Sequence, residues 1–365
     1  MNQLIFEGRC LMGMVGSIMR REELKILYQR MDWERMYRLA EYHHVVPMVY
    51  LGILGHGKDV PARCMERFFT RYWNYLEVME HWQESESEVL TLFNMKKVPC
   101  ILLGSNQIRD IYPIKEAAGV HSLVLLVEKE SYTLARGFLI DLGYERLESL
   151  EGAGERFKGS GGQMAELYWD VPFKPAYYRR EALKILKRAC PTAEGSVVKG
   201  LREEDGLLFA LAWAAYRYAT NSLTLQETLD LYVLHRRWWE KARRNIEDSG
   251  EGFKTGGFWR RLLVFSYMWF GEKQESYCQE QELLEDSDKA FDVLEKRFLT
   301  KGMIQTETDP EILALQKAIE AEEEREQRKE RWNRLRIQAA EIWEDWKRRA
   351  FSLKAIRGLK RLVRR

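Results

Sequence analysis

The sequence predicts an α+β protein in which a small mixed sheet is flanked by helical N- and C-terminal regions and followed by a long charged helix. Three observations support this class. Apolar residues recur at helical spacing through most of residues 1–90 and again after residue 201. Between these regions, residues 97–190 contain short runs of branched and aromatic residues that suit strands. Residues 309–346 lack Gly and have their only Pro near the start, as a single long helix requires.

The N-terminal part is expected to be helical throughout. Residues 21–39 and 60–92 carry apolar positions at helical spacing, and the glycines at 55 and 57 separate them. Pro47 lies in the junction 41–50, where it suits the first turn of a helix. We expect four parts along the chain: a helical region at 1–95, an α/β core at 96–190, a second helical region at 191–308, and a charged helix with a basic amphipathic tail at 309–365.

The core is expected to begin with a buried strand, a Gly-Ser turn into a helix, and a second buried strand. The apolar runs predict strands at 99–103, 123–127 and 165–171. Residues 130–142 suit a helix that ends at Gly143. The Gly-rich residues 151–162 are interpreted as a turn between strands.

The second helical region is expected to contain a buried helix at 203–219 and an amphipathic helix at 225–237, with a loop at 250–257. Residues 276–295 are acidic. In the final helix, charged pairs four residues apart indicate a solvent-facing surface. These pairs are Glu324/Arg328 and Glu330/Arg334. A seam for packing on the body or on a partner is predicted at Trp332, Leu335, Ala339, Ile342 and Trp346.

Composition places the chain among cytoplasmic globular proteins. Its 365 residues can bury a full core, and 45% of them are hydrophobic. The five cysteines are scattered without metal-ligand spacing, which favours a reducing compartment. No apolar run reaches the roughly 18 residues of a membrane-spanning helix. The start of the chain lacks a cleavage-like site, so we expect no signal peptide.

The tail at 347–365 is strongly basic although the whole chain has a net charge of only +2. It carries nine Lys or Arg and no acid. Its apolar residues fall on the other half of a helical wheel, which is typical of a helix lying on anionic lipid. Contact with an acidic protein or nucleic acid, and a plain solubilising terminus, remain open alternatives. Peripheral membrane attachment is therefore an expectation beside the cytoplasmic one.

A Gly-Ser turn between a strand and a helix has a chemical use. Because glycine has no Cβ, backbone N–H groups and a serine hydroxyl can approach a triphosphate there. Gly104 and Ser105 form this turn. Such turns are also common in proteins without a ligand, so the motif carries little weight without its neighbours.

The neighbouring motifs resemble a bacterial family of uncharacterised nucleotidyltransferases with the polymerase-β-type fold. In that family a Leu-Lys-Gly strand end precedes a Tyr-Pro loop, an arginine, an Asp-x-Asp-Leu-Leu-Val strand and a Leu-Gly-Tyr helix end. The resemblance spans about residues 25–240 of this sequence. The matching segments are Leu102 to Ser105, Ile111 to Pro113, 123–127, Leu142 to Tyr144, Glu41 to Pro47, Glu166 to Trp169, and Leu229 to Leu231.

The sequence departs from the family pattern where the resemblance implies metal binding. The two family aspartates fall on Ser122 and Val124, and only the third carboxylate, Glu166, is present. Three other family positions are also changed: the lysine falls on Leu103, the loop arginine on Ala118, and the histidine on Tyr168. Nucleotidyl transfer needs two Mg²⁺ ions, which require anionic oxygen ligands. Serine is neutral and valine is apolar, so the resemblance implies a degenerate site.

The favoured hypothesis is a catalytically degenerate member that acts by binding a nucleotide or a protein. The implied nucleotide-binding residues are Gly104, Ser105 and Ser122, Glu166 is a relic catalytic carboxylate, and no metal ligand or cofactor is expected. One alternative is an active enzyme that moves NMP from NTP to a protein, sugar or small molecule, with Mg²⁺ and NTP bound. Another is a peripheral membrane or scaffold protein that works through its tail. A protein partner for residues 309–346 and an anionic membrane or acidic partner for 347–365 are expected.

Other polar residues have structural interpretations beside functional ones. His43 and His44 suit capping or packing at a helix junction. His121 next to Ser122 suggests a nucleophile, but adjacent strand residues point to opposite faces. Glu128 and Glu130 after the second strand suit a solvated strand end more than substitute ligands. Asp205 and Asp230 lie on predicted helices and suit capping or pairing.

Overall fold

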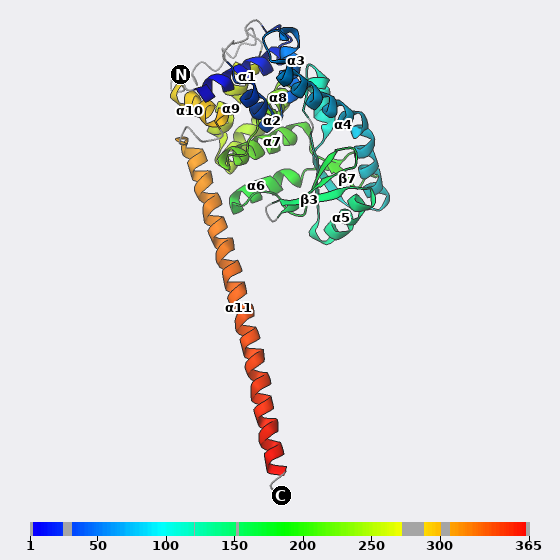
Figure 1. The fold of residues 1–365 in the computed structure, drawn as a ribbon, viewed down its shortest axis with the longest axis vertical. Coiled ribbons are helices and arrows are strands. Elements are labelled where there is room, and N and C mark those ends of the chain that lie inside the picture. Colours follow the sequence, from blue (N-terminus) through cyan, green and yellow to red (C-terminus); the bar gives the residue numbers. More distant parts are fainter. Residues whose placement is uncertain are drawn as a thin grey trace. The chain divides into compact units, whose positions relative to one another are not determined.

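The structure is a computed structural model that describes residues 3–24, 31–119, 121–150, 153–271, 288–300 and 307–362. It divides into two compact units, Met1–Gln316 and Lys317–Arg365. The first unit contains a mixed sheet with helices before and after it, and the second continues the last helix of the chain (Figure 1). The predicted α+β class is therefore confirmed.

Four helices precede the sheet. Pro47 lies in the first turn of the third one, as predicted. The expectation of helix throughout is wrong at residues 20–24, because Arg21 adopts the left-handed conformation with φ 54° and ends the first helix. The same expectation is wrong at residues 31 and 32, and residues 25–30 lie outside the described residues. The helices are α1 (Gln3–Met19), α2 (Trp33–Tyr42), α3 (Val46–Ile53) and α4 (Ala62–Met95), with a short 3₁₀ turn, η1 (Leu54–His56), after α3.

The sheet has seven strands in the order β3-β4-β5-β2-β1-β7-β6. Two pairs, β1 with β7 and β2 with β5, are parallel, and the other pairs are antiparallel. The mixed sheet that the sequence predicted is thus present. Its strands are β1 (Cys100–Gly104), β2 (Leu123–Val127), β3 (Glu145–Leu150), β4 (Gly154–Lys158), β5 (Met164–Tyr168), β6 (Cys190–Pro191) and β7 (Val198–Gly200).

Three features of this region differ from the expectation. The predicted turn at 151–162 contains β4, which pairs with β3 and β5 and buries Phe157 fully. The Gly-Ser turn leads into the 3₁₀ helix η2 (Asn106–Ile111), followed by η3 (Lys115–Ala117), and not into an α-helix. The short strands β6 and β7 were not predicted. The helix before Gly143 is confirmed as η4 (Lys129–Ser131) and α5 (Tyr132–Asp141), and Gly143 has φ 82°.

One face of the sheet forms the main core. Leu123, Leu125 and Val127 of β2 are buried in one core cluster with residues of α4 and α5. Both helices lie beside the sheet in Figure 1. Since strand side chains alternate, the residues between these three, including Val124, belong to the opposite face. That second face carries the polar residues considered below.

Among the described residues, one helix lies between β5 and β6, and four more follow β7 before the last helix of the chain. The predicted loop at 250–257 is wrong, since only Lys254 and Thr255 separate two helices there. Lys254 takes the left-handed conformation with φ 58°, and Gly250 lies against Gly256 so closely that a Cβ on Gly250 would be 3.0 Å from the Gly256 Cα. The two glycines therefore allow close packing of the two helices and do not form a loop. The helices are α6 (Ala176–Leu186), α7 (Glu203–Ala219), α8 (Leu225–Phe253), α9 (Gly256–Phe270) and α10 (Asp288–Leu299).

The last helix, α11 (Pro310–Leu362), confirms the predicted long charged helix. The two expected charged pairs are present: Arg328 bonds Glu324 at 3.1 Å, and Arg334 bonds Glu330 at 3.5 Å. The acidic segment 276–295 lies mostly outside the described residues. Among the described helices, none is long and apolar enough to cross a membrane.

Candidate functional site

Four neighbouring strands place one residue each in a single row across the sheet. Gly104 of β1 pairs with Val124 of β2, and Val124 pairs with Glu166 of β5. Arg156 of β4 pairs with Glu166 on its other side. Directly paired residues point to the same face of a sheet. The structure therefore brings the Gly-Ser turn, the second strand and the single carboxylate together, as the family pattern implies.

The Gly-Ser turn is shaped by close packing and by a local cap. A Cβ on Gly104 would lie 3.1 Å from Cγ2 of Val124, so glycine allows β1 to pack tightly against β2. The Oγ atom of Ser105 accepts a hydrogen bond from the backbone N–H of Gln107 at 3.0 Å. The hydroxyl expected to contact a nucleotide thus caps η2.

The two positions of the family aspartates lie beside Glu166 and Gly104. Ser122 is half-buried immediately before β2, and its carbonyl oxygen is 3.9 Å from the Cβ position on Gly104. Val124 is also half-buried and lies directly across from Glu166. Within the ranges that the structure describes, no group of three or more His, Cys, Asp or Glu side chains is placed to hold a metal ion. The donor set at this place does not fit two divalent cations.

Both carboxylate oxygens of Glu166 have protein partners. The Nε and Nη2 atoms of Arg156 lie 3.0 and 2.9 Å from Oε1. The hydroxyl of Tyr168 donates to Oε2 at 2.9 Å. Burial would lower the pKa of Arg156, but the carboxylates of Glu166 and Glu148 outweigh it and raise this pKa above its usual value. Burial and Glu166 also raise the pKa of Tyr168, so the phenol stays protonated and continues to donate.

Arg156 is one of three arginines whose charges act on His44. Desolvation by the surrounding protein atoms is the largest cause that lowers the pKa of His44. Another part of this residue is exposed to solvent. The charges of Arg217, Arg71 and Arg156 lower that pKa further. Each of the three arginines also has a glutamate partner. The pairs are Arg71 with Glu41 at 4.0 Å, Arg217 with Glu227 at 2.6 Å, and Arg156 with Glu148 and Glu166.

A second polar cluster ties the loop before β2 to α8. Nε2 of His121 lies 2.9 and 3.0 Å from the two carboxylate oxygens of Asp230. The hydroxyl of Tyr112 donates to Asp230 at 2.5 Å, and the amide of Gln226 donates to Tyr112 at 2.8 Å. The His121 ring thus engages α8, and Asp230 is a pairing residue, as expected.

The remaining residues singled out in the sequence have structural roles. Nδ1 of His43 accepts a hydrogen bond from the backbone N–H of Leu225 at 3.1 Å, at the start of α8. This confirms the capping interpretation of His43. The carboxylate of Asp205 accepts from Nε of Arg188 at 3.0 Å. Glu128 and Glu130 are exposed after β2, in agreement with a solvated strand end.

Arg156 is the residue of this site that the sequence interpretation missed. It lies in β4, which was assigned to a turn. A single apolar residue, Phe157, next to charged residues is too weak a pattern to predict a strand. Even with that strand assigned, its pairing with Glu166 depends on the β4–β5 register, which no local pattern specifies.

Comparison with known proteins identifies a family for this chain. No curated protein matches the chain. No solved structure matches it either. The model of the family described as uncharacterised nucleotidyltransferase matches residues 29–250, which is more than half of the chain. The match includes the whole row from Gly104 to Glu166 and the Asp230 cluster. The chain therefore belongs to the uncharacterised nucleotidyltransferase family.

Proposed function

We propose that this protein is a catalytically degenerate member of its family, which binds a nucleotide through its phosphates without Mg²⁺ and does not transfer the nucleotidyl group. The observation that carries the proposal is the pairing of Val124 with Glu166, where the family pattern has two carboxylates facing one another. Glu166 is in turn neutralised by Arg156.

The charge balance at the row supports this view. Two Mg²⁺ ions beside a triphosphate need several anionic oxygen ligands. Only one carboxylate is present among the positions that the family pattern uses, and both of its oxygens accept hydrogen bonds from protein groups. The guanidinium of Arg156 supplies positive charge here, but it does not hold the attacking and leaving oxygens together as two metal ions do.

The arginines supply the contacts that a phosphate would need. Guanidinium groups bind phosphate oxygens through paired, charge-assisted hydrogen bonds. The side chain of Glu148 is 55% exposed, so its ion pair with Arg156 contributes little stability and a phosphate can compete for the same guanidinium. Arg71 and Arg217 act together with Arg156 to lower the pKa of His44, so positive charge from all three reaches this one side chain.

Calorimetric titration of the full chain with ATP, in Mg²⁺ and in EDTA, tests the proposal. The expected result is binding of similar affinity in both buffers. The Arg156→Ala variant should bind about tenfold or more weakly, because a charge-assisted contact is lost. Arg180→Ala, which removes an exposed arginine of α6, is the matched control and should bind as the wild type does.

Two results would overturn the proposal. Binding that requires Mg²⁺ would indicate an active transferase with ligands from elsewhere, and undetectable binding in both buffers would remove the nucleotide as ligand. A parallel assay with labelled nucleoside triphosphates checks activity directly. Transfer of label to the protein or to any added acceptor would contradict the degenerate assignment.

A further inference from the structure

Helix α11 exposes large apolar side chains in a region dominated by charge. Trp332 is 74% exposed and Leu335 is 52% exposed. They are three residues apart and so share one side of the helix. Ile337 is 57% exposed but lies on another side. Exposed tryptophan and leucine next to each other usually mark a surface that a partner covers.

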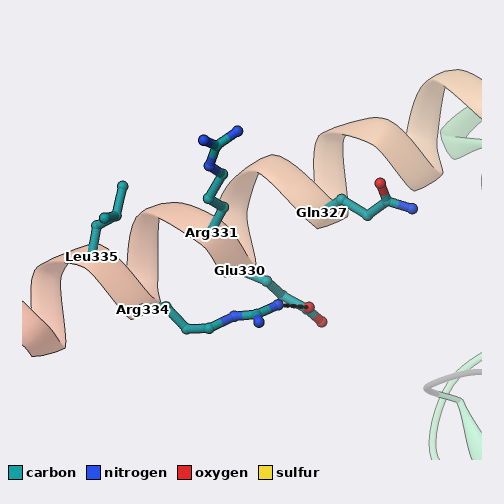
Figure 2. A pocket seen from close by; sticks show the side chains of 5 residues that line it. All are labelled: Gln327, Glu330, Arg331, Arg334 and Leu335. Carbon is teal, nitrogen blue, oxygen red and sulfur yellow. Dashed lines mark hydrogen bonds and ion pairs between the residues drawn. The ribbon is translucent and has the colours of Figure 1, made fainter.

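The charged residues near Leu335 are arranged around that side. Arg331 extends on the same side as Leu335, whereas the Glu330–Arg334 ion pair lies on the other side (Figure 2). In a coiled coil, apolar positions three and four apart form the contact and charged residues flank it. Arg331 occupies such a flanking position next to Leu335.

The apolar positions repeat once, and four of the five seam positions, all except Trp346, are symmetric about residue 337. Seven residues after Trp332 and Leu335, the helix reaches Ala339 and Ile342. Trp332 and Ile342 are each five residues from position 337, and Leu335 and Ala339 are each two residues from it. A second helix running in the opposite direction and centred at 337 would therefore set Trp332 opposite Ile342 and Leu335 opposite Ala339.

The charged segments of α11 are also arranged about residue 337. Residues 320–326 contain five Glu and one Arg, and residues 328–336 contain five Lys or Arg and one Glu. After the centre the signs are reversed: 341–345 contain three acids and no base, and 347–354 contain four bases and no acid. An antiparallel copy places acidic opposite basic segments on both sides of residue 337. A parallel copy in register would place like charges together.

We propose that α11 pairs with α11 of a second copy of this chain, as an antiparallel two-stranded coiled coil centred on residue 337. Such a contact is self-complementary and closes with two-fold symmetry, so it gives a dimer and not a filament. In its apolar layers, Trp332 packs at position 342 of the second copy and Leu335 packs at position 339. Arg331 faces Asp345 of the second copy, and this charge pair occurs twice.

Sedimentation or light scattering of the full chain across a range of concentrations tests the dimer. The wild type should have twice the mass of the chain at micromolar concentration. Leu335→Glu and Trp332→Asp should be monomeric with unchanged helical circular dichroism. Ile337→Glu is the matched control, since it alters an equally exposed apolar residue of the same helix outside the contact, and it should remain a dimer.

The orientation has its own test by cysteine cross-linking, with the wild type as background for the native cysteines. A mixture of Leu335→Cys and Ala339→Cys chains should form a disulfide across the two copies, and Leu335→Cys by itself should not.

Reversal of one charge by Arg331→Glu should weaken the dimer roughly three- to tenfold, and the double change Arg331→Glu/Asp345→Arg should restore it. A monomeric wild type, loss of the dimer in Ile337→Glu, or cross-linking of Leu335→Cys alone would each overturn the proposal. A monomer that binds anionic vesicles would assign α11 to a lipid surface instead.

Discussion

The guanidinium of Arg156 contacts a single oxygen of Glu166 through two nitrogen atoms, Nε at 3.0 Å and Nη2 at 2.9 Å. Glu166 is almost fully buried, whereas Arg156 also reaches the exposed Glu148. The pair joins β4 to β5 on the sheet face that carries Val124. Glu166, which the family resemblance implies as a relic of the metal-binding carboxylates, is thus paired with a guanidinium group.

Removal of Arg156 should destabilise the fold. Arg156→Ala leaves Glu166 buried without its cation, and the expected loss is about 1–3 kcal/mol, because Arg156 is partly exposed and solvent reduces the full effect. The double variant Arg156→Ala/Glu166→Gln should recover part of this loss, since the neutral amide needs no counter-charge. Urea unfolding of the two single variants and the double variant measures the coupling. Equal losses in Arg156→Ala and in the double variant would contradict it.

Restoration of two carboxylates should create a metal site. In Ser122→Asp/Val124→Asp, three acids meet at the row with Glu166, and Mg²⁺ or Mn²⁺ should raise the melting temperature in proportion to its concentration. Ser122→Asn/Val124→Asn has side chains of nearly the same shape without charge and serves as the control. Thermal unfolding with and without the metal provides the measurement. A similar shift in the wild type would show that ligands already exist elsewhere.

The Gly104 position should tolerate alanine poorly. The new Cβ would lie 3.1 Å from Cγ2 of Val124, a β-branched side chain with little freedom to turn, so we expect a loss of about 1–2 kcal/mol. Val124→Ala in the same chain removes that contact and should return part of the stability. Gly137→Ala in α5 is the control, because a Cβ there meets no atom within 4 Å, and it should be neutral or stabilising. An equal loss in both glycine variants would exclude the steric explanation.

Acid should destabilise the protein through His235. Burial lowers the pKa of His235 to about 4, from an ordinary value of 6.5. Between these two pH values the unfolded chain binds a proton that the folded chain does not, so stability is full above pH 6.5 and falls as the pH is lowered towards 4. The expected loss is about 3 kcal/mol over this window.

Urea unfolding at several pH values checks this prediction in the His235→Gln variant. The slope of stability against pH between 6.5 and 4 should decrease by about one proton in that variant. His81→Gln changes an exposed histidine of α4 and should keep the wild-type slope. An unchanged slope in His235→Gln would mean that other groups cause the acid sensitivity.

Elements with strong local patterns could be predicted from the sequence. The continuous apolar run 123–127 coincides with β2, and residues 203–219 coincide with α7. The candidate positions 104, 124 and 166 do meet in the sheet. Weak local patterns failed: β6 and β7 are only two and three residues long, and the glycines at 250 and 256 serve helix packing instead of a loop.

The sequence by itself determined the class of the fold, the long charged helix and the absence of carboxylates at positions 122 and 124. These depend on residue type and on spacing within a few turns, which a linear chain already contains. Only the tertiary structure decided which charges meet: Arg156 at Glu166, and Asp230 at His121. The first pair depends on strand order and register, and the second depends on how α8 packs beside the loop before β2. Both contacts join residues that are distant from the local patterns of the chain.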